Sequence, residues 1–302
     1  FIVEKEFPGI TIGEEEKKMG IKGSSTVQVF FSDCMVPKEN LLGEREGGFK
    51  MALNILNSGR IKIGSSAVGG SKLAIEKSVK YANKRMQFNT KISDFGAIKH
   101  KLADMAVKTF AIESATYRIG HLIELKYQSL LSSGMSPSES KLSAIREYAI
   151  ECSISKVYGS DILCYVTDES IQIHGGMGYA TETGVERGYR DARITKIYEG
   201  TNEINRMLSV GMLIKKSMKG ELDLMNAVVK VVNELTQGNS FEKTDEHHLL
   251  SEEQQKIENL KKVFLMIAGS AFQKYGPALE KNQQILLGLS DMMIEIYFAE
   301  SA

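Results

Sequence analysis

One carboxylate in the second half of the chain stands where it could remove a proton. Glu199 follows the apolar pair Ile197-Tyr198 and precedes Gly200, just ahead of a helical pattern that includes Ile204. This spacing predicts a loop that enters a helix. A carboxylate there can point into a cleft, and glycine lets another molecule approach the backbone closely. The alternative is a charge that complements the dipole at a helix N-terminus.

A glycine-rich turn follows another helical pattern. Gly175, Gly176 and Gly178 occur within four residues, directly after Gln172-Ile173-His174. Glycine permits a positive φ and lets a phosphate or a ring contact the backbone. Taken alone, such a turn is more often a helix C-cap.

A cation and an aromatic residue stand close together at the end of the first long helical pattern. Arg85 and Phe88 lie in the segment Asn83 to Phe88. Phosphate or planar-ring recognition uses a pair of this kind, because guanidinium groups bind phosphate and stack on rings. The alternative is an ordinary helix end, with the arginine on the helix dipole.

Composition excludes several classes of partner. The 302 residues include 38 basic and 38 acidic side chains, which cancel and give no field that favours nucleic acid. The three cysteines show no CxxC spacing, so we expect neither disulfides nor a metal site, and a reducing compartment fits. His247-His248 lies in a polar segment, which predicts a solvated pair.

The first residues and the lengths of the apolar runs give two further expectations. The chain begins with Phe1-Ile2-Val3-Glu4, which has the character of a strand, so we expect a piece of a longer protein. Apolar runs such as Val263 to Ala268 are far shorter than the roughly 20 residues that span a membrane.

Periodicity divides the chain into three parts. Residues 1–45 alternate like strands, with turns at glycines, and predict a partial β-domain. Residues 46–220 have helical period, with one proline at Pro137, and predict an antiparallel four-helix bundle. Residues 221–302 predict additional helices, Leu222 to Leu235 and Ile257 to Tyr275, separated by polar Gln237 to Glu246. The fold class is therefore mainly α.

The predicted bundle has three long helices and a shorter fourth. The first follows Arg60 and is marked by Ala67 to Ala82; the second runs from Ile98 to about Leu131. The third begins at the cap Ser136-Pro137 and continues to about Ile173, and the fourth follows Glu199.

Together these motifs resemble the acyl-CoA dehydrogenase family, specifically its very-long-chain branch, over residues 1 to about 220. The motifs that carry the resemblance are Lys18 to Lys22, Val36-Pro37, Asn40 to Gly43, Asn57 to Arg60, Arg85 to Phe88, Asp94 to Gly96, Gln172 to Gly178, Gly184 to Arg187, Arg190 to Arg193 and Tyr198 to Thr201.

The resemblance implies an FAD enzyme that oxidises a long or very-long fatty acyl-CoA to the trans-2-enoyl-CoA in fatty acid β-oxidation. Glu199 would remove the α-proton while the β-hydrogen leaves as hydride to the flavin. Its backbone N–H and a ribityl hydroxyl would bind the thioester oxygen, which is an oxyanion-hole device. Exclusion of water strengthens a carboxylate base, and Ile197 and Tyr198 would help to exclude it.

Some branches of the family place the base on another helix, at the position of Gly59, which has no side chain here. Glu199 is therefore the candidate base, and Gly59 leaves space for an acyl chain. Arg60 would order the thioester end of the substrate, together with Asn57, Tyr198 and Gly200. The alternative for Arg60 is a surface ion pair.

The resemblance also implies a shared cofactor. The residues that would contact the FAD of a neighbouring subunit are Arg85, Gln87, Phe88, Phe95, Gln172, Gly175 and Gly176. Thr201 and Glu203 would contact the flavin of their own subunit. A shared FAD implies a homodimer or a dimer of dimers, with electron-transfer flavoprotein as the electron acceptor.

Three departures from the family pattern matter. Asn89 replaces a usual glycine, Glu203 replaces glutamine or aspartate, and the N-terminal helical domain with half of the β-domain is lacking.

A shorter-chain acyl-CoA dehydrogenase, or a scaffold with the family fold, is the alternative function. The bacterial cytoplasm is the expected compartment, with the mitochondrial matrix as the alternative. An apolar stripe at Val263 to Phe272 either packs on the bundle, which is favoured, or contacts a membrane.

Overall fold

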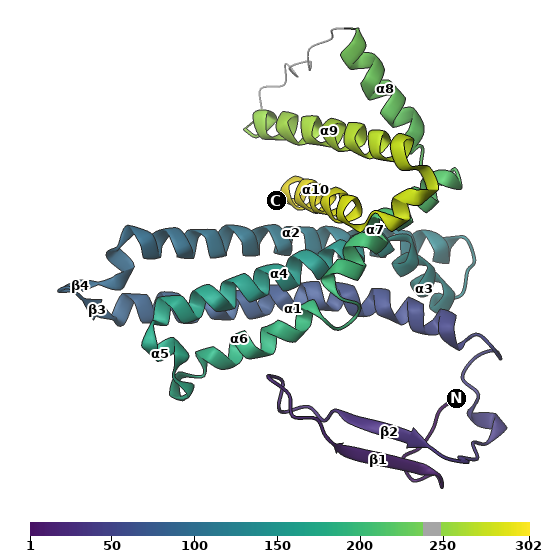
Figure 1. Ribbon diagram of the computed structural model, residues 1–302, viewed down its shortest axis with the longest axis horizontal. Coiled ribbons are helices and arrows are strands. Elements are labelled where there is room, and N and C mark those ends of the chain that lie inside the picture. Colours follow the sequence, from purple (N-terminus) through teal and green to yellow (C-terminus); the bar gives the residue numbers. More distant parts are fainter. Residues whose placement is uncertain (238–248) are drawn as a thin grey trace.

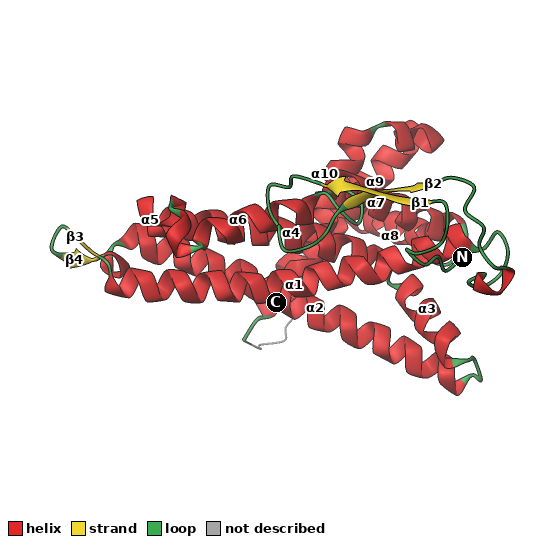
Figure 2. Ribbon diagram, turned by 90° about the horizontal axis from the view of Figure 1, so that it is seen from below, coloured by secondary structure: helices red, strands yellow, loops and turns green. Residues whose placement is uncertain are grey.

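Helices make up most of the structure, a computed structural model that describes residues 1–237 and 249–302 (Figure 1). One pair of short strands lies at one end of the helical body (Figure 2), and the other pair lies along one of its sides (Figure 1). The mainly α fold is therefore confirmed. The predicted polar separator Gln237 to Glu246 and the pair His247-His248 fall almost wholly on residues 238–248, which lie outside the described residues.

The bundle is formed by α1 (Gly48–Lys84), α2 (Gly96–Ser132), α4 (Ala149–His174) and α7 (Asn202–Met218). Its centre is apolar and includes Met105, Ile112, Val157 and Val166, all fully buried. Glycine allows α1 and α4 to approach closely, because a β-carbon on Gly64 would lie 2.2 Å from the Ser155 Oγ atom. The helix α1 begins at Gly48, well before Arg60. The prediction that the first helix follows Arg60 therefore placed its start too late.

A short hairpin connects α1 to α2. The strands β3 (Met86–Gln87) and β4 (Thr90–Lys91) pair in an antiparallel register, and η2 (Ile92–Asp94) follows them. Phe88 and Asn89 form the turn with φ angles of 51° and 59°, as a type I′ hairpin turn requires. Asparagine tolerates this left-handed conformation better than most residues, so Asn89 can replace the usual glycine.

The third predicted helix is two helices, so the prediction of one continuous helix was wrong. The first is α3 (Pro137–Glu147) and the second is α4, and Tyr148 between them has φ −98° and ψ 31°, outside the helical region. The predicted cap is confirmed, because the Ser136 hydroxyl accepts a hydrogen bond from the Glu139 N–H. No glycine or proline stands at Tyr148; the break places α3 against α2.

A winding segment links α4 to α7. It consists of α5 (Gly176–Tyr179), η3 (Thr181–Thr183), α6 (Val185–Arg193) and η4 (Ile194–Lys196), which the sequence did not predict. The helix α6 packs against α4 and also holds the N-terminal region. Arg190 donates a hydrogen bond to the carbonyl of Met19, and the Ile21 N–H donates to the carboxylate of Asp191 at 2.5 Å.

The N-terminal region is a two-stranded sheet of β1 (Ile10–Glu15) and β2 (Val27–Phe31), followed by η1 (Lys38–Asn40). The strand expected at Phe1 to Glu4 does not form. Ile2 instead exchanges hydrogen bonds with Asn40, from its N–H to the Asn40 carbonyl and from the Asn40 amide to its carbonyl. A strand needs a paired neighbour along its length, and this isolated exchange does not provide one.

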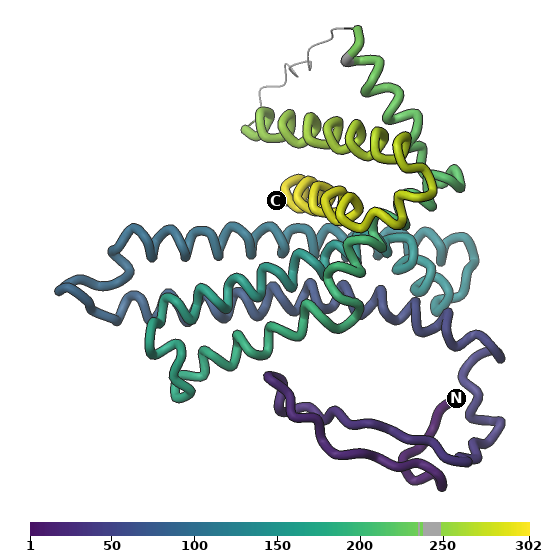
Figure 3. Tube along the Cα trace, viewed as in Figure 1, coloured from purple at the N-terminus to yellow at the C-terminus, as the bar shows by residue number. Residues whose placement is uncertain are grey.

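Three further helices lie on the other side of the bundle from the sheet (Figures 1 and 3): α8 (Leu224–Thr236), α9 (Ser251–Tyr275) and α10 (Gln283–Ser301), with η5 (Gly276–Lys281) before the last. The sequence did not predict α10. In the apolar stripe of α9, Phe264 and Phe272 pack into the core with α7 and α10, whereas Met266 and Ile267 stay partly exposed. Among the described helices, none is both long and apolar enough to cross a membrane. The division of the chain into three domains, with boundaries at residues 45 and 220, stays a prediction.

Candidate active site

Glu199 and Gly200 form a left-handed turn at the entrance of α7. Their φ angles are 58° and 82°, and a positive φ is unfavourable for glutamate by about 1–3 kcal/mol. Thr201 then caps the helix, because its hydroxyl accepts a hydrogen bond from the Ile204 N–H at 3.3 Å. The predicted loop before a helix is therefore confirmed. Strain of this kind persists only where surrounding contacts hold the turn.

The Glu199 carboxyl group points at α1 where that helix has no side chain. A β-carbon built on Gly59 would lie 2.6 Å from the carboxyl carbon and 2.6 Å from Oε2 of Glu199. Oε2 is buried and has no hydrogen-bond partner among the described residues. Buried polar atoms without a hydrogen-bond partner are rare in folded proteins, and a catalytic role is one explanation for them. Because no neighbour occupies Oε2, this atom is available to a reacting group.

Two side chains hold the turn by its backbone carbonyls. The Asn205 amide, fully buried in α7, donates to the carbonyls of Glu199, Gly200 and Thr201 at 3.3, 2.8 and 3.1 Å. The Arg60 Nε donates to the Glu199 carbonyl at 3.3 Å. The Glu199 N–H has no hydrogen-bond partner among the described residues, so it remains free to donate.

Arg60 is buried, with 6% of its surface exposed, and its other donors contact Asn57 Oδ1 at 3.1 Å and Ser153 Oγ at 3.4 Å. Burial lowers the pKa of the guanidinium, and the nearby Glu199 carboxylate opposes that shift. The alternative of a surface ion pair for Arg60 is wrong, because the side chain lies between α1, α4 and the turn.

A competing base near Arg60 is disfavoured. Cys152 is another titratable group that interacts with Arg60, and burial raises the pKa of that thiol to about 12. The thiol therefore stays protonated at neutral pH. The apolar residues expected to cover the site, Ile197 and Tyr198, are 47% and 41% exposed, so within this chain they form a rim and not a lid.

A third anchor of the turn comes from α4. Lys156 is fully buried and donates to the Gly200 carbonyl at 2.8 Å and to Asn202 Oδ1 at 2.7 Å. Burial lowers the pKa of its ammonium to about 8. The Asn202 amide donates in turn to Ser160 Oγ and to Asp161 Oδ1. Sequence reasoning missed Lys156, Asn202 and Asn205; a lone lysine within the apolar pattern of the third predicted helix was the available signal.

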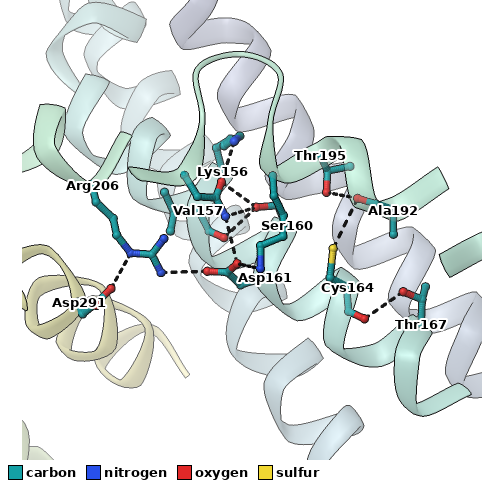
Figure 4. A network of polar contacts seen from close by, with 12 residues as sticks. Lys156, Val157, Ser160, Asp161, Cys164, Thr167, Ala192, Thr195, Arg206 and Asp291 are labelled. Atoms are coloured by element: carbon teal, nitrogen blue, oxygen red, sulfur yellow. Dashed lines mark hydrogen bonds and ion pairs between the residues drawn. The ribbon is translucent and has the colours of Figure 1, made fainter. Parts of the chain in front are cut away.

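This polar network continues away from the turn (Figure 4). Asp161 forms ion pairs with Lys196 at 2.7 Å and with Arg206 at 3.0 Å, and Arg206 bridges to Asp291 of α10 at 2.6 Å. The turn is thus connected through side chains to α4, α7 and α10. Such networks fix a unique geometry when their members are satisfied.

A second set of predicted residues gathers at the far end of α1. Of the residues expected to bind the cofactor, Arg85, Gln87, Phe88, Phe95, Gly175 and Gly176 line one hollow of about 490 Å³, together with Tyr81 and His174. Gln172 lies in the last turn of α4 beside it and is exposed. Phe88 is 87% exposed and meets Phe95 edge to face, at 6.4 Å between ring centroids.

The hollow has the chemistry of a site for an anionic, aromatic molecule. Gly175 has φ 58° and ψ −138°, a conformation that glycine alone adopts readily. A β-carbon on Gly175 or Gly176 would meet no atom within 4 Å, so the space in front of both is open. The Arg85 side chain is exposed and has no hydrogen-bond or ion-pair partner among the described residues; its backbone groups bond to Tyr81 and Ile92.

The structure does not bring the two sets together. Gly59 and Arg85 are 26 residues apart on one continuous helix, which corresponds to about 39 Å. Thr201 and Glu203 accompany Glu199 at the first site, at the N-terminus of α7, where Glu203 is exposed. A backbone hydrogen bond and a bond to the Thr201 side chain lower the pKa of Glu203.

Comparison with known proteins shows the family. The acyl-CoA dehydrogenase C-terminal domain matches residues 46–212, and a second acyl-CoA dehydrogenase C-terminal domain matches residues 259–302. The chain therefore belongs to the acyl-CoA dehydrogenase family. A probable acyl-CoA dehydrogenase of Bacillus subtilis (strain 168) is 45% identical over 302 residues, 100% of this chain and 50% of that protein.

Other relatives differ in substrate. The mitochondrial very long-chain specific acyl-CoA dehydrogenase of Rattus norvegicus is 45% identical over 68% of this chain and 29% of its own length. The mitochondrial short-chain specific enzyme of Homo sapiens is 39% identical over 71% of this chain and 48% of its own length. The crystal structure of the Bacillus anthracis acyl-CoA dehydrogenase complexed with FAD aligns with a TM-score of 0.95 and 48% identity, over 100% of this chain and 51% of that chain. The chain spans half or less of the length of these curated relatives.

Proposed function

We propose that the longer protein, of which we expect this chain to be part, is an FAD-dependent acyl-CoA dehydrogenase. It would convert a fatty acyl-CoA to the trans-2-enoyl-CoA in fatty acid β-oxidation. The observation that carries the proposal is the Glu199 carboxyl group, held on a left-handed turn with one buried and unpaired oxygen facing Gly59. Proton abstraction needs a base that is fixed in place and not neutralised by a neighbour.

The residues of the turn have separate tasks in this reaction. The Glu199 carboxylate removes the α-proton of the thioester. Its free backbone N–H donates to the thioester oxygen, which stabilises the charge that develops there. Arg60 and Asn205 hold the Glu199 carbonyl and thereby fix the direction of both groups. Asn57, Tyr198 and Gly200, which lie around them, are proposed to contact the substrate.

FAD would accept the β-hydrogen as hydride, and the residues of this chain fit it in two places. The exposed Arg85, the rings of Phe88 and Phe95 and the open backbone at Gly175 and Gly176 suit a pyrophosphate and a planar ring system. Gln87 and Gln172 complete this set. Thr201 and Glu203 are proposed to contact a flavin beside Glu199.

The separation of the two places supports a shared cofactor. Because about 39 Å of helix lies between them, the Arg85 end of one subunit would serve the Glu199 site of another. We therefore propose a homodimer or a dimer of dimers, in which each FAD lies between two subunits. Electron-transfer flavoprotein is proposed as the electron acceptor, and the bacterial cytoplasm as the compartment.

A long or very long acyl chain is the proposed substrate. Gly59 leaves the space beside Glu199 unfilled. Helices α8 to α10 extend the chain beyond the bundle, which fits the very-long-chain branch that the sequence resembles. The alternative is a shorter chain, because short-chain specific relatives are also similar. Turnover of the full-length protein with a series of acyl-CoA chain lengths would separate the two.

The experiment that tests the activity is anaerobic titration of the full-length flavoprotein with a long-chain acyl-CoA. We expect the flavin absorbance to bleach as the substrate is oxidised. A protein that binds FAD and shows no bleaching with long- or short-chain acyl-CoA would contradict the proposal and favour a scaffold.

Arg85→Ala in the full-length protein is expected to weaken FAD binding and to loosen the dimer together. Hydrogen bonds to charged groups contribute about 1.5–3 kcal/mol, which corresponds to roughly 10- to 150-fold in affinity. Flavin content after dialysis and the dimer fraction in size-exclusion chromatography should fall in parallel. Arg146→Ala, at an exposed position on α3, is the matched control. Full flavin occupancy in the Arg85 variant would exclude this role.

A further inference from the structure

A buried lysine with no carboxylate partner is the feature of the fold that the reaction so far leaves unexplained. Lys156 is the largest of the fully buried side chains. Among the described residues, no carboxylate lies within ion-pair distance of its ammonium. A buried, unpaired charge is costly, so a position of this kind needs a compensating role.

The acceptors of Lys156 show what it holds. Its two hydrogen bonds go to neutral oxygens: the Gly200 carbonyl at 2.8 Å and Asn202 Oδ1 at 2.7 Å. One belongs to the strained turn and the other to the first residue of α7. The ammonium therefore couples the turn to the helix that follows it.

The nearest charges are committed elsewhere. Asp161, on the same helix, pairs with Lys196 and Arg206. Glu203 on α7 also attracts the ammonium, whereas Arg60 on α1 and Arg206 on α7 repel it. Neither carboxylate takes the lysine away from the turn, so the ammonium remains directed at the two oxygens.

We infer that Lys156 is a positioning residue for Glu199. Its hydrogen bonds hold the turn in the left-handed conformation, in which the Glu199 carboxylate faces Gly59, where the substrate is proposed to bind. This inference rests on the proposed function. Glutamate at a positive φ tends to relax toward ordinary backbone angles, and relaxation of the turn would rotate its carboxylate. Charge-assisted hydrogen bonds are about twice as strong as neutral ones, so the lysine opposes that relaxation better than Asn205 alone.

Lys156→Met in the full-length protein tests the inference. Methionine keeps most of the apolar volume and removes both hydrogen bonds. We expect kcat for acyl-CoA oxidation to fall about 10²-fold, the effect of a displacement near 1 Å, with KM and flavin content nearly unchanged. Lys141→Met, at an exposed position on α3, is the matched control and should leave kcat unchanged.

Hydrogen exchange provides a second readout that does not depend on activity. Backbone amides in residues 198–206 should exchange faster in Lys156→Met than in the wild type, while amides of α1 and α2 should not. If the methionine variant does not fold, Lys156→Gln, which keeps a neutral NH2 donor group, is measured by the same criteria.

The outcomes separate the inference from the proposed function. A wild type that binds FAD but does not oxidise acyl-CoA overturns the function, and the exchange data still decide whether Lys156 holds the turn. Unchanged kcat and unchanged exchange in residues 198–206 overturn the inference. So does a variant in which kcat, flavin content and exchange throughout the bundle change together, because that pattern shows a merely structural role.

Discussion

Glu199→Gln in the full-length protein is expected to abolish acyl-CoA oxidation while FAD stays bound. The amide has nearly the same shape as the carboxylate, so the turn and its anchors to Arg60 and Asn205 should remain. It cannot accept the α-proton, however, and loss of a general base costs about 10²–10⁴-fold in rate. The measurement is the rate of anaerobic flavin reduction by acyl-CoA in a stopped-flow instrument.

The matched control for this variant is Glu124→Gln, an exposed glutamate on α2 whose carboxylate accepts a hydrogen bond from Gln128 of its own helix. It should reduce its flavin at the wild-type rate. Near-normal reduction in the Glu199 variant would mean that another group takes the proton. The thiol of Cys152 is a poor substitute, because burial raises its pKa to about 12.

Long helices were the part of the fold that the sequence predicted best, since their period is visible over many turns. The second helix was expected from Ile98 to about Leu131 and is observed as α2, Gly96–Ser132. The break at Tyr148 could not be predicted, because neither glycine nor proline marks it and packing of α3 against α2 decides it. Helix α6 was missed because it is short and mostly polar.

The candidate site was predicted in its parts and not in its geometry. The sequence indicated Glu199 in a loop, but its positive φ depends on partners in α1, α4 and α7 that lie far away in the chain. The role of Arg60 in ordering the thioester end of the substrate stays a prediction, and the sequence did not indicate that its side chain is buried and contacts the turn. Buried polar contacts between distant segments leave no local signal, and this is why Lys156 and Asn205 were missed.

The division of the predicted residues between two ends of α1 also follows from structure alone. Motif order places Arg85 between Gly59 and Glu199 in the sequence, although the folded chain returns Glu199 to Gly59 and leaves Arg85 about 39 Å away along the helix. Helix α4 ends beside Arg85, because its last residue His174 lines the same hollow, and the segment from α5 to η4 then runs back along α4 to Glu199 (Figure 1). Glu199 and Arg85 therefore act, under the proposal, in different catalytic sites of one oligomer.

Gly59→Ala should reduce acyl-CoA oxidation nearly as strongly as a change in the base itself. The new β-carbon would lie 2.6 Å from the Glu199 carboxyl carbon. An ordinary contact needs about 3.4 Å or more, so the carboxylate must move by roughly 1 Å, and a displacement of this size costs about 10²-fold in rate. Flavin content should stay normal, since Gly59 is not among the residues proposed to contact FAD and the cap that Thr201 forms on α7 does not involve it.

Gly69→Ala is the matched control, because it makes the same substitution on the same helix where a β-carbon meets no atom within 4 Å. Alanine is favoured over glycine within a helix by about 0.5–1 kcal/mol, so this variant should melt at a slightly higher temperature and keep the wild-type rate. The comparison isolates the steric effect of the methyl group at residue 59 from the general effect on the helix. If Gly59→Ala oxidises acyl-CoA as fast as Gly69→Ala does, the Glu199 carboxylate is not held against α1 during the reaction, and the assignment of the base to this position fails.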